Sequence, residues 1–304
     1  DAQESRGLGD VYKRQVSALT RNFGDLELVD MEENFKAGAL AFTDDGIPNR
    51  NSKLIVDAMN RAKELGAIIS FHEEDPNLIE ENGINHSEVS DALNIYGSPT
   101  IAETSFIARD VAMAIYTGAK ISIQHISTRL GVDLVKFGKS MGANIYAEVT
   151  PHHLALNDRA VLKYGTLAKM NPPLRSEEDR LRIIEGIKEG TIEIIATDHA
   201  PHSSEEKAKE ITKAPSGIIG LETSFSICYE NLVLSGEISL MKLIELMSTN
   251  PSKIYGLEGG EIAVGKLADL AIIDLESEYK IEKFKSKSSN SPFAGKNLRG
   301  EVLY

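Results

Sequence analysis

Residues 192–202 read IEIIATDHAPH, a short apolar run that ends in an aspartate and two histidines. Four earlier stretches repeat this arrangement: ALAFTDDG (39–46), AIISFHEE (67–74), ISIQH (121–125) and IYAEVTPHH (145–153). Helical patterns follow these runs, at residues 53–65, 102–117, 132–141, 178–188, 221–234 and 240–247. Apolar runs that alternate with helical patterns are typical of βα units and a parallel sheet. We therefore predict an α/β fold, a TIM-type (β/α)8 barrel of which about the last five βα units are present.

The chain divides into three segments by the texture of its sequence. Residues 1–15 read DAQESRGLGDVYKRQ, which has neither apolar periodicity nor a capping pattern. We therefore predict a non-native-looking or poorly ordered tail and linker over residues 1–26, and a partial barrel over 27–256. Residues 259–274 read GGEIAVGKLADLAIID, a turn-rich stretch before a short β-run. This change of texture predicts part of a small β-domain over residues 257–304.

Composition excludes several classes of protein. The 304 residues are 41% hydrophobic, which is enough to bury a sizeable core. The net charge of -13 argues against a nucleic-acid partner, because that would require a clustered basic face. No apolar run approaches the length of a membrane span. The single cysteine rules out a disulfide within the chain and favours a reducing compartment, so we expect a cytoplasmic protein.

Six of the seven histidines lie at or just after an expected strand end: His72, His125, His152, His153, His199 and His202. In a (β/α)8 barrel the side chains that carry chemistry stand at the carboxyl ends of the strands. Imidazoles and carboxylates without cysteine are the ligands that Zn²⁺ takes in hydrolytic sites, where it activates water near neutral pH. The histidines, together with Asp45 and Asp198, favour a metal site over a set of separately satisfied polar residues.

Some of these residues also have a simpler interpretation. The TDDG stretch at 43–46 fits a turn with a capping carboxylate. Hydrogen bonding to the local backbone explains His199 better than metal ligation does, and core packing explains Cys228. Asp198, in contrast, stands where one carboxylate can hold a metal and accept a proton from bound water. The chain has no G-x-S-x-G elbow and no P-loop, the motifs of two rival chemistries.

Seven motifs, taken in order, resemble bacterial dihydroorotases of the longer type in which an aspartate bridges the metals. They are AFTDDG, SFHEE, QHIST, AEVTPHHL, KMNPPLR, ATDHAPHSSEEK and NSPFAG. The resemblance runs from about residue 28 to residue 304. It implies a zinc-dependent amidohydrolase with a TIM barrel that interconverts dihydroorotate and N-carbamoyl-L-aspartate in pyrimidine (UMP) biosynthesis.

The same resemblance assigns roles to residues of this chain. Asp45 matches the carboxylate that bridges two Zn²⁺ ions, and His72 and His125 match the ligands of the second metal. Asp198 matches a ligand of the first metal that is also the catalytic acid–base.

Four further residues match positions that contact the substrate: Asn171, His202, Ser216 and Gly217. The family more often has an aromatic residue where this chain has Ser216. We interpret His152 and His153 as support for the pocket rather than as metal ligands.

Some family features have no match in this sequence. The first barrel strand of the family ends in His-x-His, which completes the first metal, followed by an arginine that binds the substrate carboxylate. At about 30 residues per βα unit, we expect roughly 90 upstream residues to be missing. We therefore expect the chain as written to be an N-terminally truncated fragment, inactive and poorly stable, whereas the intact enzyme is expected to be a homo-oligomer.

Two alternatives to dihydroorotase stay open at this point. One is another cyclic amidohydrolase, a hydantoinase or an allantoinase, which usually bridges its metals with a carboxylated lysine. No lysine occurs in residues 39–45, and this favours dihydroorotase. The other is a non-catalytic dihydroorotase-like subunit that scaffolds aspartate carbamoyltransferase, a protein that is also a candidate partner of the enzyme.

The stretch SSEEKAKEITKAP, residues 203–215, is rich in charge and poor in large apolar residues. It follows a strand end, so we predict either a mobile loop at the mouth of the pocket or an ordinary solvated loop.

Overall fold

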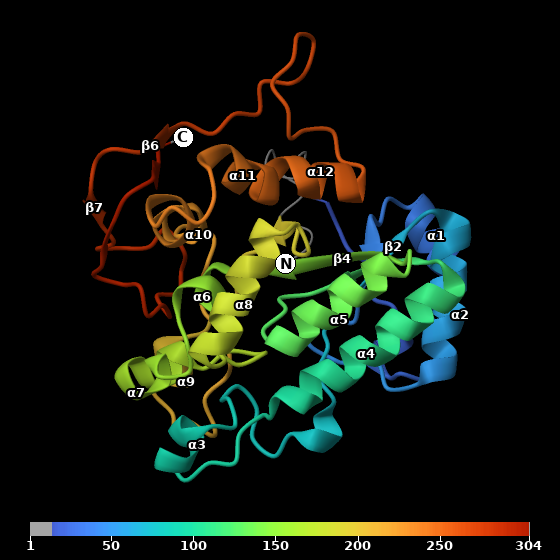
Figure 1. Cartoon of the computed structure of the whole chain (residues 1–304), viewed down its shortest axis with the longest axis horizontal. Coiled ribbons are helices and arrows are strands. Elements are labelled where there is room, and N and C mark those ends of the chain that lie inside the picture. The colour runs from blue at the N-terminus through green and yellow to red at the C-terminus, as the bar shows by residue number, and fades with distance from the viewer. Residues whose placement is uncertain (1–13, 304) are drawn as a thin grey trace.

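The computed structural model describes residues 14–303, and its centre is a five-stranded parallel sheet in the order β1-β2-β3-β4-β5 (Figure 1). The strands are β1 (Ala41–Phe42), β2 (Ile68–Phe71), β3 (Lys120–Ile123), β4 (Asn144–Val149) and β5 (Ile194–Ile195). Sequential parallel pairing with intervening helices is the rule of the βα unit. The predicted strands and their order are confirmed.

Four long helices cover one side of the sheet: α2 (Ser52–Leu65), α4 (Thr100–Thr117), α5 (Arg129–Ser140) and α8 (Glu177–Lys188) (Figure 1). Their ends are set by the sequence. The side chain of Thr128 accepts a hydrogen bond from the Gly131 amide at the start of α5, and that of Ser176 accepts one from Asp179 at the start of α8. Gly118 ends α4 with φ of 67°, a conformation that suits glycine.

The shorter elements connect these units. They are η3 (Arg21–Phe23), α1 (Met31–Lys36), η4 (Pro76–Leu78), α3 (Glu88–Ala92), α6 (Pro151–Ala155), α7 (Ala160–Tyr164), η5 (Gly165–Ala168) and α9 (Ser204–Lys207). The largest hydrophobic core lies between the sheet and the long helices, and it includes Phe42, Ile69, Ile121 and Val149. Each of these four side chains is fully buried.

Part of the predicted tail and linker belongs to the barrel. Residues 15–20 run parallel to β1, with hydrogen bonds from the Leu40 amide to the Gln15 carbonyl and from the Ser17 amide to the Ala41 carbonyl. Leu19 and Thr20 are buried there. The predicted boundary at residue 26 therefore differs from the structure, because residues 15–20 read QVSALT, which shows no strict apolar alternation. Residues 1–13, the rest of that prediction, lie outside the described residues.

The C-terminal helices are less regular than predicted: the first begins three residues after the predicted start at residue 221, and the second continues beyond residue 247. A helix α10 (Ser224–Cys228) continues as the π-helical η6 (Tyr229–Leu234). Next, α11 (Leu240–Ile244), the π-helical η7 (Glu245–Thr249) and α12 (Asn250–Tyr255) form one helical run. The predicted end at residue 247 is thus wrong, because Pro251 stands in the first turn of α12, where the missing amide hydrogen costs nothing.

The segment after α12 contains two small antiparallel pairs. Strand β6 (Ile273–Asp274) pairs with β9 (Glu301–Val302), and β7 (Tyr279–Lys280) pairs with β8 (Asn297–Leu298). A second hydrophobic cluster joins this segment to the barrel, and its members include Phe293, Leu298, Ile218 and Met170.

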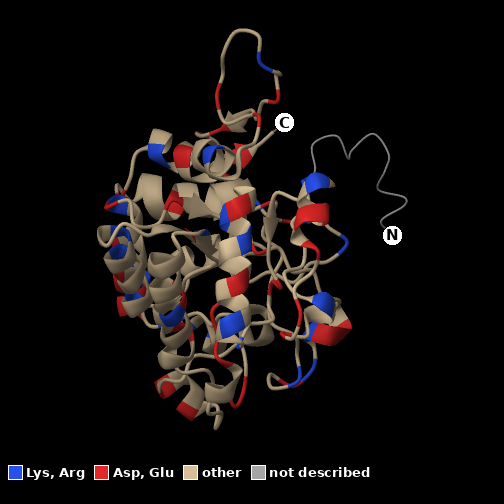
Figure 2. Cartoon of the chain, turned by 90° about the vertical axis from the view of Figure 1, so that its right-hand side faces the viewer, with Lys and Arg blue, Asp and Glu red and all other residues tan. Residues whose placement is uncertain are grey.

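Acidic and basic residues are interspersed along the ribbon in the view of Figure 2. Among residues 14–303, no helix combines the length and apolar character that a membrane crossing requires.

Candidate active site at the strand ends

The predicted metal ligands stand at the carboxyl ends of the strands. Asp45 follows β1, His72 follows β2, His125 follows β3 and Asp198 follows β5. Three of them adopt left-handed backbone angles, with φ of 49° at Asp45, 33° at His125 and 46° at Asp198. Such angles are uncommon for residues other than glycine and cluster at functional sites. The backbone therefore turns sharply at these three residues, directly after the strands.

His72 and His125 form the centre of the site. The Nδ1 atom of His72 lies 3.1 Å from the Nε2 atom of His125, and the two buried rings meet edge to face. In a tetrahedral zinc site with Zn–N bonds near 2.0–2.1 Å, two ligand nitrogens lie about 3.3 Å apart. The observed spacing is thus close to that of two imidazoles that share one metal ion.

The other nitrogen of His72 contacts two polar side chains. Its Nε2 atom lies 3.2 Å from Oε2 of Glu74 and 3.4 Å from Nδ2 of Asn171. An Nε2–H donated to Glu74 leaves Nδ1, the atom that faces His125, as an acceptor. Metal-binding histidines almost always have such a carboxylate or carbonyl partner, which fixes the tautomer and the orientation of the ring.

The two imidazoles have opposite electrostatic environments. Burial lowers the pKa of His72, but the Glu74 carboxylate, with Asp198 and Asp45, outweighs it, so that the pKa lies above its usual value. Burial, together with the charge of His72, holds the pKa of His125 well below its usual range. A neutral His125 keeps a lone pair that can bind a metal.

Asp198 and Asp45 are near this pair without touching it. Oδ2 of Asp198 is 4.0 Å from Nε2 of His152, and burial, then the charge of Asp45, raises the pKa of Asp198 to about 6. Asp45 is exposed, and its amide donates to Oγ1 of Thr43. Within residues 14–303, no three His, Cys, Asp or Glu side chains converge closely enough to hold a metal ion.

Three buried polar atoms in this region nevertheless have no hydrogen-bond partner among residues 14–303: Nδ1 of His125, Nε2 of His152 and Oδ1 of Asn171. Buried polar atoms nearly always have such a partner. With the imidazole spacing, this fits a site that is completed by a ligand. The donor set of nitrogen and carboxylate oxygen is one that Zn²⁺ accepts.

The predicted substrate residues divide between two loops. Asn171 lies beside His72, whereas Nε2 of His202 donates a hydrogen bond to the Ser216 carbonyl, 2.9 Å away. The Gly217 amide donates to the Lys169 carbonyl, and its own carbonyl accepts from Lys207. Both backbone groups of Gly217 are thus bonded within the protein. Of the two predicted neighbours Ser216 and Gly217, Ser216 is therefore the one that could contact a ligand.

The remaining histidines have structural partners. Nδ1 of His199 accepts from the Gly220 amide at 3.1 Å, so its partner is a backbone group as expected, but one that lies 21 residues away and not in the local backbone. His153 is buried between Oγ1 of Thr150 and the Pro172 carbonyl. His86 is exposed and contacts the Tyr96 carbonyl.

Two lysines anchor the predicted loop at 203–215 through three of its carbonyls and that of Gly217. Nζ of Lys169 donates to Ile211 and Ala214, and Nζ of Lys207 donates to Pro215 and Gly217. Both lysine side chains are buried, at 5% exposed. The sequence suggested a solvated loop because it shows charged residues without showing which of them turn inward.

Sequence reasoning missed the buried charges that support the site. Arg175 bonds to the Ser98 carbonyl, Asn85 and Ser127, and its Nη2 lies 3.9 Å from Glu74 and 3.7 Å from Glu103. The acidic pair after His72 and the arginine that closes KMNPPLR were visible signals. Their burial could not be read from the sequence.

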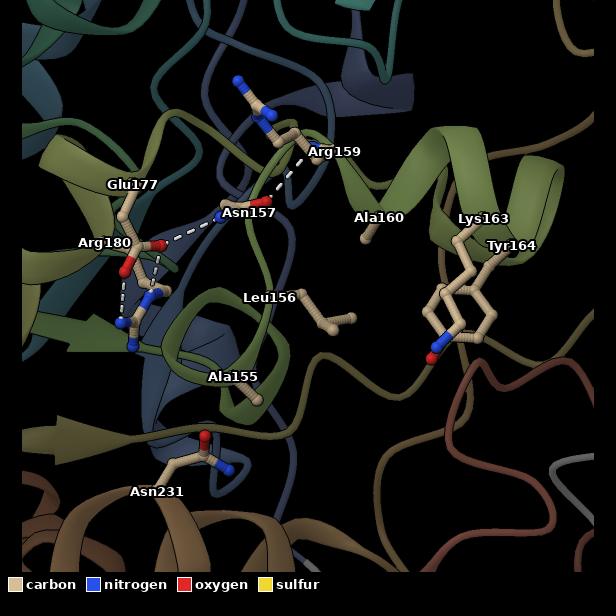
Figure 3. A pocket seen from close by; sticks show the side chains of 10 residues that line it. All are labelled: Ala155, Leu156, Asn157, Arg159, Ala160, Lys163, Tyr164, Glu177, Arg180 and Asn231. Atoms are coloured by element: carbon tan, nitrogen blue, oxygen red, sulfur yellow. Dashed lines mark hydrogen bonds and ion pairs between the residues drawn. The ribbon is translucent and has the colours of Figure 1, made fainter. Parts of the chain in front are cut away.

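A pocket on the surface lies away from these strand ends. This pocket of about 440 Å³ is lined by residues that include Asn157, Arg159, Lys163 and Tyr164, with Arg180 paired to Glu177 on one wall (Figure 3). Neither His72 nor His125 lines this pocket. We place the candidate site at the strand ends, because the unpartnered nitrogens lie there.

The model of the Amidohydrolase family matches residues 7–304, so the chain belongs to the amidohydrolase class of hydrolases. An L-hydantoinase (dihydropyrimidinase) from Arthrobacter aurescens has a similar structure, with a TM-score of 0.81 and 24% identity. The alignment covers 95% of this chain and 67% of that one. A D-hydantoinase gives a TM-score of 0.79 at 20% identity, over 95% of this chain and 66% of that one. Likeness at this level of identity shows the fold alone, that of an incomplete TIM barrel.

Sequence relatives are more specific. A dihydroorotase from Clostridioides difficile is 53% identical over 95% of this chain and 69% of its own length. Dihydroorotases from Clostridium acetobutylicum and Lactococcus lactis are 48% and 46% identical, over 95% and 97% of this chain and 68% and 70% of their own lengths. The chain therefore belongs to the dihydroorotases of the amidohydrolase family.

Proposed function

We propose that this chain carries the second-metal side and most of the substrate side of a dihydroorotase site. The reaction is the reversible hydrolysis of the cyclic amide of dihydroorotate to N-carbamoyl-L-aspartate, a step of pyrimidine synthesis. The observation that carries the proposal is the pair of buried imidazoles, His72 and His125, whose nitrogens face each other at 3.1 Å. They stand at adjacent parallel strand ends in a chain that is 53% identical to a dihydroorotase.

The residues present suit Zn²⁺ as the cofactor. His72 and His125 would hold the second of two ions, Asp45 would bridge the pair, and Asp198 would bind the first. Bound Zn²⁺ supplies Lewis acidity, which polarises a carbonyl and makes water a stronger nucleophile. Because Asp45 is exposed and stands apart from the imidazoles, its side chain has to turn inward for this role.

The chain's own groups would do the rest. Asp198 would take a proton from the attacking water and return it to the ring nitrogen that leaves. Asn171, beside His72, and His202 and Ser216, on the opposite loop, would orient the substrate through hydrogen bonds. The buried surroundings of the imidazole pair would strengthen each of these interactions by excluding water.

Two further candidates from the sequence differ in what they predict. A hydantoinase or allantoinase would bridge with a carboxylated lysine, and the relatives at 44–53% identity are dihydroorotases instead. A scaffold for aspartate carbamoyltransferase would bind that enzyme without turnover. We propose that the enzyme is a homo-oligomer of the cytoplasm. It is either associated with aspartate carbamoyltransferase or free of it.

The test is an assay of the intact enzyme after treatment with a chelator and reloading with Zn²⁺, because the chain as written is expected to be inactive. We expect hydrolysis of dihydroorotate, but not of hydantoin or allantoin, and only in the reloaded sample. Zinc bound tightly with no turnover of any of the three substrates would favour the scaffold. Turnover of hydantoin at a comparable rate would overturn the substrate assignment.

The bridging role of Asp45 has its own test. Asp45→Ala should lower zinc stoichiometry, and added bicarbonate should not restore it, because an aspartate needs no CO₂ to become a ligand. Recovery of zinc with bicarbonate would mean that a carboxylated lysine elsewhere forms the bridge.

A further inference from the structure

The motif NSPFAG, residues 290–295, begins with a buried asparagine that lies far from the barrel strands in the chain. Asn290 is 4% exposed. Its Nδ2 donates to the carbonyls of Ala200 and Gly217, at 3.0 and 3.1 Å, and its Oδ1 accepts from the His202 amide at 3.2 Å. One side chain thus satisfies three backbone groups in two separate segments.

The two segments are those that carry the proposed substrate contacts. Ala200 and His202 follow β5, whereas Gly217 comes after the loop at 203–215. Asn290 is bonded to both, across 88 residues to His202 and 73 residues to Gly217. It therefore joins the two segments from outside the barrel, in addition to two direct bonds between them. In those bonds the Ala200 amide donates to the Ile218 carbonyl, and Nε2 of His202 donates to the Ser216 carbonyl.

The segment that carries Asn290 is itself fixed in place. Phe293 is 2% exposed and packs in the same hydrophobic cluster as Ile218. The Ile219 amide donates to the backbone carbonyl of Asn290 at 3.1 Å. This bond does not involve the Asn290 side chain, so it reports on the position of the segment independently.

The lysines that anchor the same loop do not duplicate this role. Lys207 donates to Pro215 and Gly217, and Lys169 donates to Ile211 and Ala214. Neither lysine side chain bonds the turn that carries His202, according to the contacts of residues 14–303. Of these three side chains, only that of Asn290 bonds both the segment after β5 and the segment with Gly217.

We propose that Asn290 is a positioning residue that holds His202 and Ser216-Gly217 at the spacing needed to bind the substrate. The substrate part rests on the proposed function. Through this contact the C-terminal segment takes part in the active site, and its role is to set affinity rather than to take part in bond breaking.

The experiment compares Asn290→Ala and Asn290→Asp with Asn297→Ala, which removes an exposed amide from the same segment. Hydrogen exchange of the free full chain is followed at two amides. In Asn290→Ala the His202 amide should exchange roughly tenfold faster, as loss of one hydrogen bond implies, and the Ile219 amide should not change. Asn290→Asp keeps an acceptor for His202 and should restore its protection.

Affinity gives the second readout, as the Kd for N-carbamoyl-L-aspartate measured by calorimetry, which needs no turnover. We expect Asn290→Ala to raise this Kd roughly tenfold, a change that corresponds to the free energy of about one hydrogen bond. Asn290→Asp, which sets a carboxylate against two carbonyl oxygens, should raise it at least as much despite the protected His202 amide. Asn297→Ala should match the wild type in both readouts.

Two results would overturn the inference. Equal loss of protection at His202 and Ile219 would show that Asn290 only holds the segment to the barrel. Unchanged affinity with an exposed His202 amide would show that the spacing does not matter for the substrate. If the wild type binds no N-carbamoyl-L-aspartate, the proposed function fails, while the exchange data still decide whether Asn290 joins the two segments.

Discussion

The two sides of the candidate site are built in different ways. On the metal side, His72 and His125 follow β2 and β3 directly, so the pairing of two strands places both rings. On the substrate side, His202 and Ser216 lie in loops whose backbone is held by Lys207 and Asn290. The first side depends on the sheet, whereas the second depends on long side chains that arrive from elsewhere. Damage to one side should therefore leave the other intact.

The largest effect should come from the metal side. His125→Ala removes one of the two imidazoles, and the remaining single ring cannot provide the ligand number of a zinc site. We expect zinc binding at this position to be abolished, measured as metal content after gel filtration. The exchange protection of the His202 amide should stay as in the wild type.

The matched control is His86→Ala, since His86 is exposed and its ring contacts the Tyr96 carbonyl and ring. Its zinc content should not differ from that of the wild type. Equal zinc content in His125→Ala and His86→Ala would mean that the imidazole pair is a structural contact.

The neighbouring residues Asp44 and Asp45 allow a second comparison, between a carboxylate that stabilises the fold and one proposed to bind metal. Asp44 is buried and accepts from the Leu19 and Thr20 amides and from Asn49, whereas Asp45 is exposed. Asp44→Asn sets an amide group against these donors and should lower the free energy of unfolding by roughly 2–3 kcal/mol.

Asp45→Asn should change stability by no more than about 0.5 kcal/mol, as is usual for exposed positions, and should instead lower zinc content. Urea denaturation and metal analysis of both variants check this. A larger stability loss in Asp45→Asn than in Asp44→Asn would reverse the assignment of the two aspartates.

These aspartates also show what the sequence could and could not predict. Apolar runs with polar ends predicted five strands and the residues that follow them, because strand length and alternation are local properties. The left-handed turn that exposes Asp45 and buries Asp44 depends on residues 19 and 20, which looked like a tail. For the same reason the sequence predicts no structural role for Arg175 in KMNPPLR or for Asn290 in NSPFAG. Their partners lie from 48 to 90 residues away, and only the folded chain brings them together.

A smaller effect is expected from the support of His72. Glu74→Gln keeps the shape of the side chain but weakens its hold on the Nε2–H of His72. Variants of such supporting residues typically lose about 10–100-fold in metal affinity. Competition with a chromogenic chelator measures this, and the nitrogen shifts of His72 in NMR report the tautomer directly.

The control for this variant is Glu64→Gln, in which the altered carboxylate is exposed and paired with Arg61. It should keep the wild-type zinc affinity. Loss of affinity in Glu74→Gln without a change in the His72 tautomer would show that Glu74 acts through its charge and not through orientation.

The smallest effect is a dependence on pH that belongs to the substrate side. Burial, together with the nearby charge of Lys169, lowers the pKa of Lys207 from 10.5 to about 8. Between these two values the unfolded chain holds a proton at this residue that the folded chain has released. The unfolded state then binds more protons, so the stability contributed at this position rises as pH increases from about 8 toward 10.5. Below about pH 8 both states are protonated and the dependence vanishes.

Subtracting Lys207→Met from the wild type isolates this behaviour from the other groups that titrate at high pH. The difference in the free energy of unfolding should move in favour of the wild type by less than about 1 kcal/mol per pH unit above pH 8. Urea denaturation at pH 7, 8, 9 and 10 supplies the values, and Lys209→Met, at an exposed position, should run parallel to the wild type. Zinc content at the strand ends should be unaffected in both variants, because the lysine anchors only the loop. A difference that stays constant across this range would mean that Lys207 keeps its proton while buried against the Pro215 and Gly217 carbonyls, and the loop would then be anchored by a full charge.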